Sequence, residues 1–403
     1  MGAATNAWLI LRQKGPLPFL RKVIERLEGP EANRVSLVAY DDARAVDWST
    51  PHPAVANPVT VPDGPLTVAW IMSPPGEGSG GHQNIFRFIR YLEAAGHRVK
   101  IYLYSTSEVY TLSQIRVRVA SGSYPTVAAT IEDYPAGGVG AGIDAIVATG
   151  WETAYPAYRD ASPARRLYFV QDYEPYFYGV GTDSVLAENT YRFGFSGITA
   201  GNWLAAKLAA DYGMPTRSYE FGADRSNYHL VNSGQRREIF FYARPGTTRR
   251  GYELGIMTLD NFARERPDYV INLAGWDVSR YSIPFPYTNL GTLPVSELNA
   301  LYNRCAAGLV LSLTNMSLLP LELLAAGVIP VVNDAPNNTM VSSNPFIEYT
   351  PASPRALADR LIAVVDRADL AEHSRQAAES IGTEGWDGSG RQFIAAFEDV
   401  VRG

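Results

Sequence analysis

Three arginines lie close together in the sequence YARPGTTRRG at residues 242–251. Arg244 follows an apolar run that predicts a strand, and Arg249 and Arg250 open the helical pattern behind it. A guanidinium group can bind two phosphate oxygens at once, so this spacing favours a diphosphate site. A solvated basic turn is the alternative interpretation. No Walker-type motif occurs in this segment, which excludes a P-loop.

A single acid, Glu322, lies in the long apolar stretch between Glu297 and Asp334. Burying an unpaired carboxylate is costly, so this position predicts a ligand such as the hydroxyls of a sugar or ribose. A solvated glutamate on a surface helix is the alternative. The loop in front of the predicted helix begins at Thr314. The backbone amides of residues 317–319 (Ser317, Leu318 and Leu319) open that helix and could face an anion.

The amino-terminal half contains a turn-rich loop, SPPGEGSGG, at residues 73–81 between a predicted strand and a predicted helix. Gly80 and Gly81 would let the backbone approach a ligand closely. His82 and Gln83 are predicted to cap the helix and to point into the cleft. A loop without a ligand, with His82 as a surface capping residue, is the competing interpretation.

A second polar segment, YFVQDYEPYFY at residues 168–178, follows the strand predicted at 167–171. Ligand sites form at this end of parallel strands, and aromatic rings suit a sugar face. Asp172, Tyr173 and Glu174 are therefore candidates for a ligand site at this end of the sheet. Asp172 and Glu174 could instead form a metal-binding triplet, which is disfavoured because the arginines already supply positive charge. An aromatic loop packed over the core is also possible.

Strands alternate with helices in two successive series, which predicts an α/β fold of two Rossmann-like domains facing a cleft. The first series has strands at 66–72, 98–104, 145–148, 167–171 and 197–200, and the second at 238–243, 269–274, 288–293, 309–313 and 329–332. The predicted units are an N-terminal helical extension and linker (1–62), an N-terminal Rossmann-like domain (63–220), a C-terminal Rossmann-like domain (221–385) and a C-terminal helix that crosses back to the N-terminal domain (386–403). The interdomain connection is predicted within 213–235.

Composition narrows the possible partners and the compartment. The 403 residues carry a net charge of −6, which argues against nucleic acid as the main partner. The 24 tyrosines are compatible with a carbohydrate site or with ordinary packing. The single cysteine, Cys305, is expected in a helix, and it fits a reducing cytosol. No apolar run suggests a membrane span or a secretory signal, so a cytoplasmic location is expected. The basic N-terminal extension could rest on the inner face of a membrane or pack against the body.

Taken together, the arginine cluster, the glutamate helix and the glycine loop resemble the retaining GT-B glycosyltransferases of family 4. Those enzymes carry two glutamates separated by seven residues. The second falls on Glu322, whereas the first falls on Thr314. The loop ending in two glycines and the later segment GHRV at 96–99 also match the family pattern. More narrowly, YFVQDYEP and FYARPGTTRRGYELGI look like rhamnosyltransferases of the WsaF type.

This resemblance implies transfer with retention from a nucleotide-sugar, with dTDP-rhamnose as the donor, to a saccharide or lipid-linked saccharide. Arg244 and Arg249, or Arg250 in place of the latter, would neutralise the leaving diphosphate, and Glu322 would hold the ribose. Thr314 in place of an acid suggests a donor with different hydroxyls, such as a deoxysugar. The same resemblance implies that the N-terminal domain binds the acceptor and the C-terminal domain the nucleotide-sugar. Asp172 would orient the acceptor, and the residues beside it would be His82, Gln83, Tyr173 and Glu174. Front-face attack would need no dedicated base, and no metal or other cofactor is expected.

Two other classes of function stay open at this point. One is a non-catalytic relative that binds nucleotide-sugars or glycans, and the other is a nucleotide-sugar epimerase of GT-B fold. No oligomeric state follows from the sequence.

Overall fold

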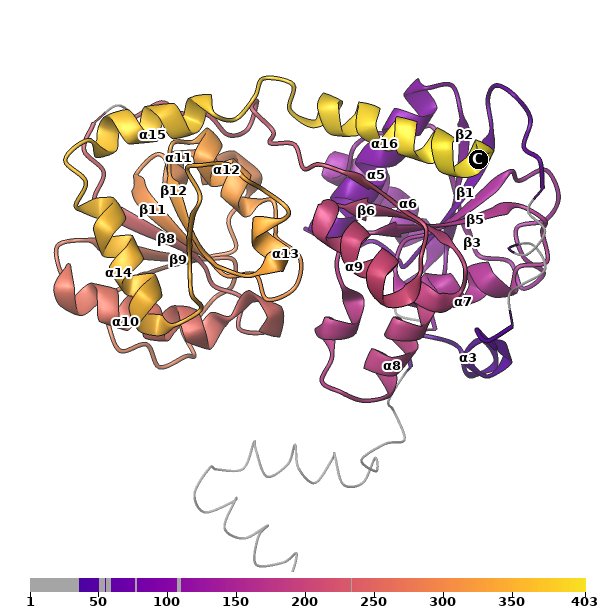
Figure 1. The fold of residues 1–403 in the computed structure, drawn as a ribbon, viewed down its shortest axis with the longest axis horizontal. Coiled ribbons are helices and arrows are strands. Elements are labelled where there is room, and N and C mark those ends of the chain that lie inside the picture. Colours follow the sequence, from indigo (N-terminus) through magenta and orange to yellow (C-terminus); the bar gives the residue numbers. More distant parts are fainter. Residues whose placement is uncertain (1–35, 51–54, 56–58, 77, 107–109, 233) are drawn as a thin grey trace, which may run out of the picture.

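The computed structural model describes residues 36–50, 55, 59–76, 78–106, 110–232 and 234–403. Two α/β domains lie side by side, each built on a parallel sheet covered by helices on both faces (Figure 1). The predicted α/β class with two Rossmann-like domains is confirmed.

The amino-terminal domain is built on seven parallel strands in the order β3-β2-β1-β4-β5-β6-β7. These strands are β1 (Thr67–Met72), β2 (Arg98–Leu103), β3 (Thr130–Asp133), β4 (Ala145–Ala148), β5 (Arg165–Val170), β6 (Ser196–Ala200) and β7 (Thr216–Tyr219). The central strands are almost entirely buried and rich in apolar residues, as a sheet covered on both faces requires.

Helices α5 (Gly80–Ala94), α6 (Leu112–Arg118), α7 (Trp151–Arg159), α8 (Thr182–Asn189) and α9 (Asn202–Tyr212) connect these strands. Short helical turns lie at η1 (Val119–Ser123), η2 (Glu174–Phe177) and η3 (Thr190–Arg192). Helix α9 ends at Gly213, whose φ of 67° is the left-handed conformation typical of a glycine helix stop.

The carboxy-terminal domain repeats the same topology with six parallel strands in the order β10-β9-β8-β11-β12-β13. They are β8 (Glu238–Tyr242), β9 (Val270–Ala274), β10 (Thr288–Gly291), β11 (Cys305–Val310), β12 (Ile329–Asn333) and β13 (Glu348–Thr350). The helical elements are η4 (Thr248–Arg250), α10 (Tyr252–Glu265), α11 (Val295–Tyr302), α12 (Leu319–Ala325), α13 (Pro336–Thr339), α14 (Pro354–Val365) and α15 (Leu370–Glu379). In both sheets, the order reverses between the first and fourth strands, which is where such folds bind ligands.

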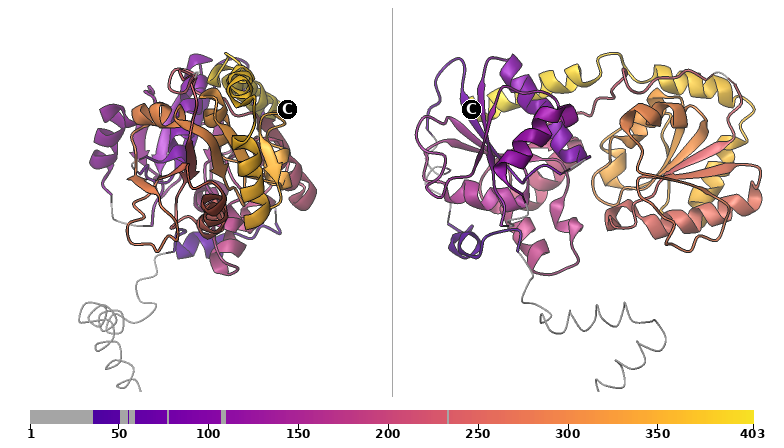
Figure 2. Two further views of the ribbon diagram at one scale, coloured as in Figure 1. Left: turned by 90° about the vertical axis from the view of Figure 1, so that its left-hand side faces the viewer. Right: turned by 180° about the vertical axis from the view of Figure 1, so that it is seen from behind.

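The last helix, α16 (Trp386–Arg402), leaves the carboxy-terminal domain and packs on α5 and β7 of the amino-terminal domain (Figures 1 and 2). Phe393 lies in an aromatic cluster with Trp70 and Phe88, at ring-centroid distances of 6.3 and 4.7 Å. The chain therefore crosses between the domains twice. The two crossings touch, because a Cβ on Gly222 would lie 2.5 Å from the carbonyl oxygen of Gly385.

Part of the N-terminal linker packs on the amino-terminal domain. Helix α3 (Tyr40–Ala45) contacts α7, and the backbone amide of Ala39 donates to the Tyr104 hydroxyl at 2.9 Å. Most of the predicted helical extension, residues 1–35 with 51–54 and 56–58, lies outside the described residues. Within the described part of the chain, no helix is both long and apolar enough to cross a bilayer.

Several sequence-based expectations about individual elements are wrong. Cys305 begins strand β11 instead of lying in a helix, because the apolar run that forms this strand starts earlier than predicted. Residues 216–219 are not part of a connection but form the edge strand β7. Strand β3 and helix α6 were not predicted at all. Both β3 and β7 are short, mostly polar edge strands, so neither carries the apolar run that marks a central strand.

Candidate functional site

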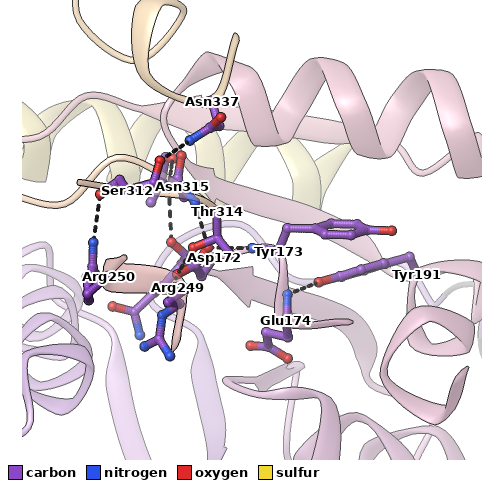
Figure 3. Close-up of polar contacts among 12 residues, drawn as sticks. Asp172, Tyr173, Glu174, Tyr191, Arg249, Arg250, Ser312, Thr314, Asn315 and Asn337 are labelled. Carbon is purple, nitrogen blue, oxygen red and sulfur yellow. Dashed lines mark hydrogen bonds and ion pairs between the residues drawn. The ribbon is translucent and has the colours of Figure 1, made fainter. Parts of the chain in front are cut away.

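The three predicted arginines follow the carboxyl end of β8, where it faces the amino-terminal domain. Figure 3 shows Arg249 and Arg250 of this cluster. Arg244 directs its guanidinium between the rings of Tyr242 and Trp276, with its Cζ 5.7 Å from each ring centroid. Arg250 donates to the Ser312 hydroxyl at 2.7 Å. All three side chains are half-buried, and burial lowers the pKa of Arg250. A cluster of partly desolvated cations favours an anionic ligand.

Asp172 reaches this cluster from the end of β5 in the other domain (Figure 3). Its Oδ2 lies 3.4 Å from Nε of Arg249, and the two side chains are 13% and 28% exposed. The guanidinium of Arg249 also lies 4.0 Å over the ring of Phe177 in η2. Among the residues that the structure describes, this is the only ion pair made by any of the three arginines. Positive charge therefore remains in excess at the domain contact.

The loop between β11 and α12 completes the contact with Asp172. The Thr314 hydroxyl donates to Oδ2 at 3.0 Å, and the backbone amide of Asn315 donates to Oδ1 at 2.8 Å. The side chain of Asn315 donates to the carbonyls of Gln171 and Ala200, at 3.2 and 2.8 Å. Thr314 and Asn315 are 1% and 2% exposed, so the described structure holds the two domains in direct contact here.

An amide network fixes the start of this loop. The carbonyl of Ser312 accepts hydrogen bonds from the side chains of Asn333, Asn337 and Asn338 at 2.9–3.1 Å. The backbone amide of Ser312 in turn donates to Asn333 Oδ1 at 2.9 Å. These contacts leave the Ser312 hydroxyl in position to accept from Arg250. The asparagines at the end of β12 and after it thus hold Ser312, which in turn holds Arg250.

Glu322 occupies the first turn of α12 and is half-buried. Burial raises the pKa of its carboxyl group to about 7, the positive charge of Arg87 opposes this rise, and Asp224 adds to it. Arg87 belongs to α5 of the amino-terminal domain, where its guanidinium lies 3.9 Å over the ring of Trp386. The carboxyl group therefore faces the domain boundary, as a ribose-binding acid would.

The glutamate and the arginines are connected through two tyrosines of the carboxy-terminal domain. Burial raises the pKa of Tyr302, and the charges of Glu322 and Tyr242 raise it further. Tyr242 accepts a hydrogen bond from Arg244 at 2.9 Å. The charge of Glu322 thus acts on Tyr302, and Arg244 is held by Tyr242 at the end of β8.

The predicted helix start at Gly80 and Gly81 lies at the carboxyl end of β1. The carbonyl of Gly81 accepts from Gln171 Nε2 at 3.2 Å, which joins this turn to the residue before Asp172. The expectation that His82 and Gln83 cap α5 is wrong, because the N-cap is Ser79. His82 donates through Nε2 to the carbonyl of Ser73 at 2.9 Å.

With Nε2 as the donor, Nδ1 of His82 accepts from the Ser79 hydroxyl at 2.8 Å. Burial lowers the pKa of His82, so a neutral imidazole fits both hydrogen bonds. Gln83 follows in the same first turn and is half-buried.

The other two residues predicted for the acceptor side are buried. Tyr173 is 4% exposed, and its hydroxyl contacts that of Tyr212. Glu174 is 6% exposed, and its Oε2 accepts from the Trp151 amide and the Tyr168 hydroxyl, both at 2.6 Å. The geometry thus gives neither side chain an open face toward the cleft, and both support the loop that carries Asp172.

Glu174 also faces a second carboxyl group that the sequence did not single out. Burial raises the pKa of Glu152, at the start of α7, and burial together with the nearby Glu152 raises the pKa of Glu174. Two carboxyl groups in one dry environment do not both ionise readily. The pair therefore keeps a proton to a higher pH than either acid would alone.

Sequence reasoning missed Asn315, which joins the two domains, and the three asparagines that fix Ser312 within the carboxy-terminal domain. It also missed Arg87, whose charge acts on Glu322. Asn315 was seen only as part of a loop, although its position directly after an apolar strand was the available signal. Among the described residues, no group of three or more His, Cys, Asp or Glu side chains could hold a metal ion. Asp172 pairs with Arg249, whereas Glu174 accepts a hydrogen bond from the buried Tyr168. The two carboxylates thus point in different directions, which does not favour a shared metal ion.

Comparison with known proteins agrees with this arrangement. The family models for the C-terminal and N-terminal domains of WsaF match residues 237–362 and 141–202. The O-antigen biosynthesis protein RfbC of Myxococcus xanthus is 33% identical over 340 residues, which cover 80% of this chain and 26% of that protein. The chain thus spans about a quarter of the length of this curated relative.

Solved structures share the two-domain architecture. HepE of Anabaena, in complex with UDP and glucose, has a TM-score of 0.60 at 12% identity and covers 83% of this chain and 99% of its own. A mutant of TarM from S. aureus, in complex with Fondaparinux, alpha-GlcNAc-glycerol and UDP, has a TM-score of 0.62 at 8% identity, covering 84% of this chain and 100% of its own. At these identities the likeness shows the fold alone. Both WsaF domain models match this chain and its two domains have the GT-B fold, so the chain is similar to the WsaF-type GT-B glycosyltransferases.

Proposed function

We propose that this chain transfers a sugar from a nucleoside diphosphate donor to a saccharide hydroxyl during the assembly of a cell-surface polysaccharide. The observation that carries the proposal is the unbalanced charge at the domain contact, where Asp172 is the only acid among the described residues that forms an ion pair with Arg244, Arg249 or Arg250. The buried Nε of Arg244 also lacks a hydrogen-bond partner among the described residues, and Nε of Arg249 has only the ion pair with Asp172 at 3.4 Å. The match to the WsaF domain models and the similarity to the O-antigen biosynthesis protein support the same class of reaction.

In this proposal, the donor diphosphate lies across Arg244 and Arg249, with Arg250 behind them. Bond cleavage at the anomeric carbon leaves negative charge on the diphosphate, and positioned guanidinium groups can lower that barrier by several kcal/mol. Backbone amides at Ser317–Leu319 would add to this stabilisation. Glu322 would accept hydrogen bonds from the ribose hydroxyls, and residues 293–298 would contact the base.

Asp172 would take a second role once a donor is bound. In the structure, its carboxylate pairs with Arg249 and accepts hydrogen bonds from Thr314 and Asn315. A phosphate that binds Arg249 would release one oxygen of Asp172, which could then accept a hydrogen bond from the acceptor hydroxyl and orient it. The same domain contact would exclude water and limit hydrolysis of the donor.

The finer proposal is that the donor is dTDP-rhamnose and that the reaction retains the anomeric configuration without a metal. Thr314 stands where related enzymes carry an acid that touches the donor sugar, and a deoxysugar offers fewer hydroxyls to such an acid. In a retaining reaction of this kind, a donor phosphate oxygen would take the acceptor proton. No side chain of this chain is then needed as a dedicated base.

Incubation with dTDP-rhamnose, UDP-glucose or GDP-mannose and a set of saccharide acceptors, followed by mass spectrometry, tests this function. We expect rhamnosyl product with dTDP-rhamnose, and loss of product in Arg244→Ala. Arg264→Ala is the matched control, because Arg264 is an exposed arginine of α10 paired only with Asp260 within the described chain. Absence of transfer with every donor, or equal transfer by Arg244→Ala, would contradict the proposal.

The same assay separates the two other classes of function. An epimerase would convert the donor without an acceptor, and a non-catalytic relative would bind the donor and leave it intact. Proton spectra of the product at the anomeric position would report retention or inversion.

A further inference from the structure

A cavity lined by polar and aromatic residues lies on the amino-terminal domain, at the carboxyl edge of its sheet. Its volume is about 470 Å³, and it lies after the carboxyl ends of β1, β2 and β3. Helix α3 of the linker and helix α6 form its other walls. The residues that define its chemistry are Asp42, Tyr104, Tyr110, Thr111, Asp133 and Tyr134. Three aromatic rings combined with two carboxylates suit a neutral ligand rich in hydroxyl groups.

Tyr110 presents the most accessible ring of this cavity, with 44% of its surface exposed. Arg118 lies over the ring with its Cζ 5.5 Å from the centroid, and it donates to the carbonyl of Pro75 at 2.8 Å. These contacts fix α6 and Tyr110 against the loop that follows β1. A fixed, exposed ring offers a sugar a stacking surface at low cost in conformational entropy.

The other two tyrosines form a rigid wall. The Tyr104 hydroxyl donates to Asp42 at 2.9 Å, and the Tyr134 hydroxyl donates to Asp160 at 2.8 Å. Their rings meet edge to face, with centroids 6.4 Å apart. Asp133 is exposed at the end of β3, where its carboxylate can accept hydrogen bonds from a ligand.

Polar groups continue from this cavity toward the domain contact along the carboxyl edge of the sheet. Burial raises the pKa of Tyr104, and Glu152, which follows β4, raises it further. Ser73, after β1, hydrogen-bonds to Glu152 and to His82. Neighbouring strands lie about 4.8 Å apart, so the three spacings from β2 to β5 place the cavity on the order of 15 Å from Asp172. This span fits an oligosaccharide and exceeds a single sugar ring.

We propose that this cavity is a saccharide subsite that holds the part of the acceptor glycan remote from the reacting hydroxyl. The inference rests on the proposed glycosyl transfer and adds the class of acceptor, a neutral oligosaccharide of several units. Tyr110 stacks on a sugar ring, and Asp133 accepts hydrogen bonds from its hydroxyls. Helix α3 closes the subsite from the linker, which gives the described part of the N-terminal segment a role in acceptor binding.

The test uses the full chain, fluorescently labelled, on an array of defined bacterial surface oligosaccharides of one to six sugars. Wild-type protein should bind at least one neutral oligosaccharide and bind its terminal monosaccharide much more weakly. The double variant Tyr110→Ala with Asp133→Asn should bind that glycan about tenfold more weakly, as expected when a stacking ring and a charged acceptor are removed. Tyr40→Ala is the matched control, since Tyr40 is an exposed tyrosine of α3 outside the cavity.

Thermal shift with dTDP, measured on the same proteins, separates this inference from the proposed function. We expect equal stabilisation by dTDP in the wild type and the double variant. If dTDP binds but no oligosaccharide does, or if the double variant binds the glycan as well as the wild type, the subsite is refuted while the transferase proposal stands. If glycan binding depends on Tyr110 and Asp133 but no nucleoside diphosphate binds, the transferase proposal fails and the saccharide site stands.

Discussion

The substitution Glu322→Gln should make the protein more stable at alkaline pH and weaken its binding of dTDP. Burial raises the pKa of Glu322 to about 7 from an ordinary value of 4.5. Between these two pH values, the folded chain keeps a proton that the unfolded chain releases. The free energy of unfolding therefore falls as the pH rises through this window, and the full loss is present above pH 7.

The loss in the free energy of unfolding follows from the difference between the folded and unfolded pKa values of Glu322. At about 1.4 kcal/mol for each pH unit, the buried carboxylate costs about 3 kcal/mol at pH 8 and almost nothing at pH 4.5. Glutamine has nearly the same shape and does not ionise. Glu322→Gln should therefore unfold at a higher urea concentration than the wild type at pH 8, and at the same concentration at pH 4.5.

The same substitution should weaken the binding of dTDP, although it stabilises the folded chain. A hydrogen bond from a ribose hydroxyl to a carboxylate contributes about 1.5–3 kcal/mol. Replacing the carboxylate by an amide should therefore lower the affinity for dTDP about 10- to 100-fold at pH 8. Glu220→Gln, at an exposed position, is the control for both measurements and should change neither. A variant that is no more stable at pH 8, or that binds dTDP like the wild type, would refute the assignment of Glu322.

Three further predictions follow from the site and its scaffold. Asp172→Asn should abolish most transfer while dTDP binds at least as tightly, because Arg249 loses its internal ion pair; calorimetry and product assays measure both. Transfer should be unchanged after treatment with EDTA, and a loss that Mg²⁺ or Mn²⁺ restores would contradict metal-independent leaving-group stabilisation. Gly255→Ala should destabilise the chain by about 1–3 kcal/mol, since its Cβ would lie 2.1 Å from the Phe241 ring; an unchanged urea midpoint would contradict this packing.

Much of the fold could be predicted because each central strand is a short apolar run followed by a helical pattern. Strands such as β1 and β12 are fully or almost fully buried, and burial on both faces of a sheet requires this composition. Edge strands are not buried on both faces, so their sequences need not be apolar. Strand β3 reads TIED and is mostly exposed, so its place in the sheet comes from pairing with β2, which no local pattern reveals.

The candidate site could be predicted in part, because arginines and acids stand out where a strand ends. The sequence could not show that Asp172 and Thr314, which are 142 positions apart, would form a hydrogen bond across the domain contact. It also did not distinguish exposed from buried polar residues within one loop. Asp172 reaches the arginines, whereas its near neighbour Glu174 is turned into the core beside Tyr168.

The central claim is that a nucleoside diphosphate binds at the arginine cluster between the domains, and calorimetric titration with dTDP tests it most directly. We predict one molecule of dTDP per wild-type chain, no measurable binding in the double variant Arg244→Ala with Arg249→Ala, and unchanged binding in Arg264→Ala. No heat of binding with dTDP, UDP or GDP, or full affinity in the double variant, would contradict the claim.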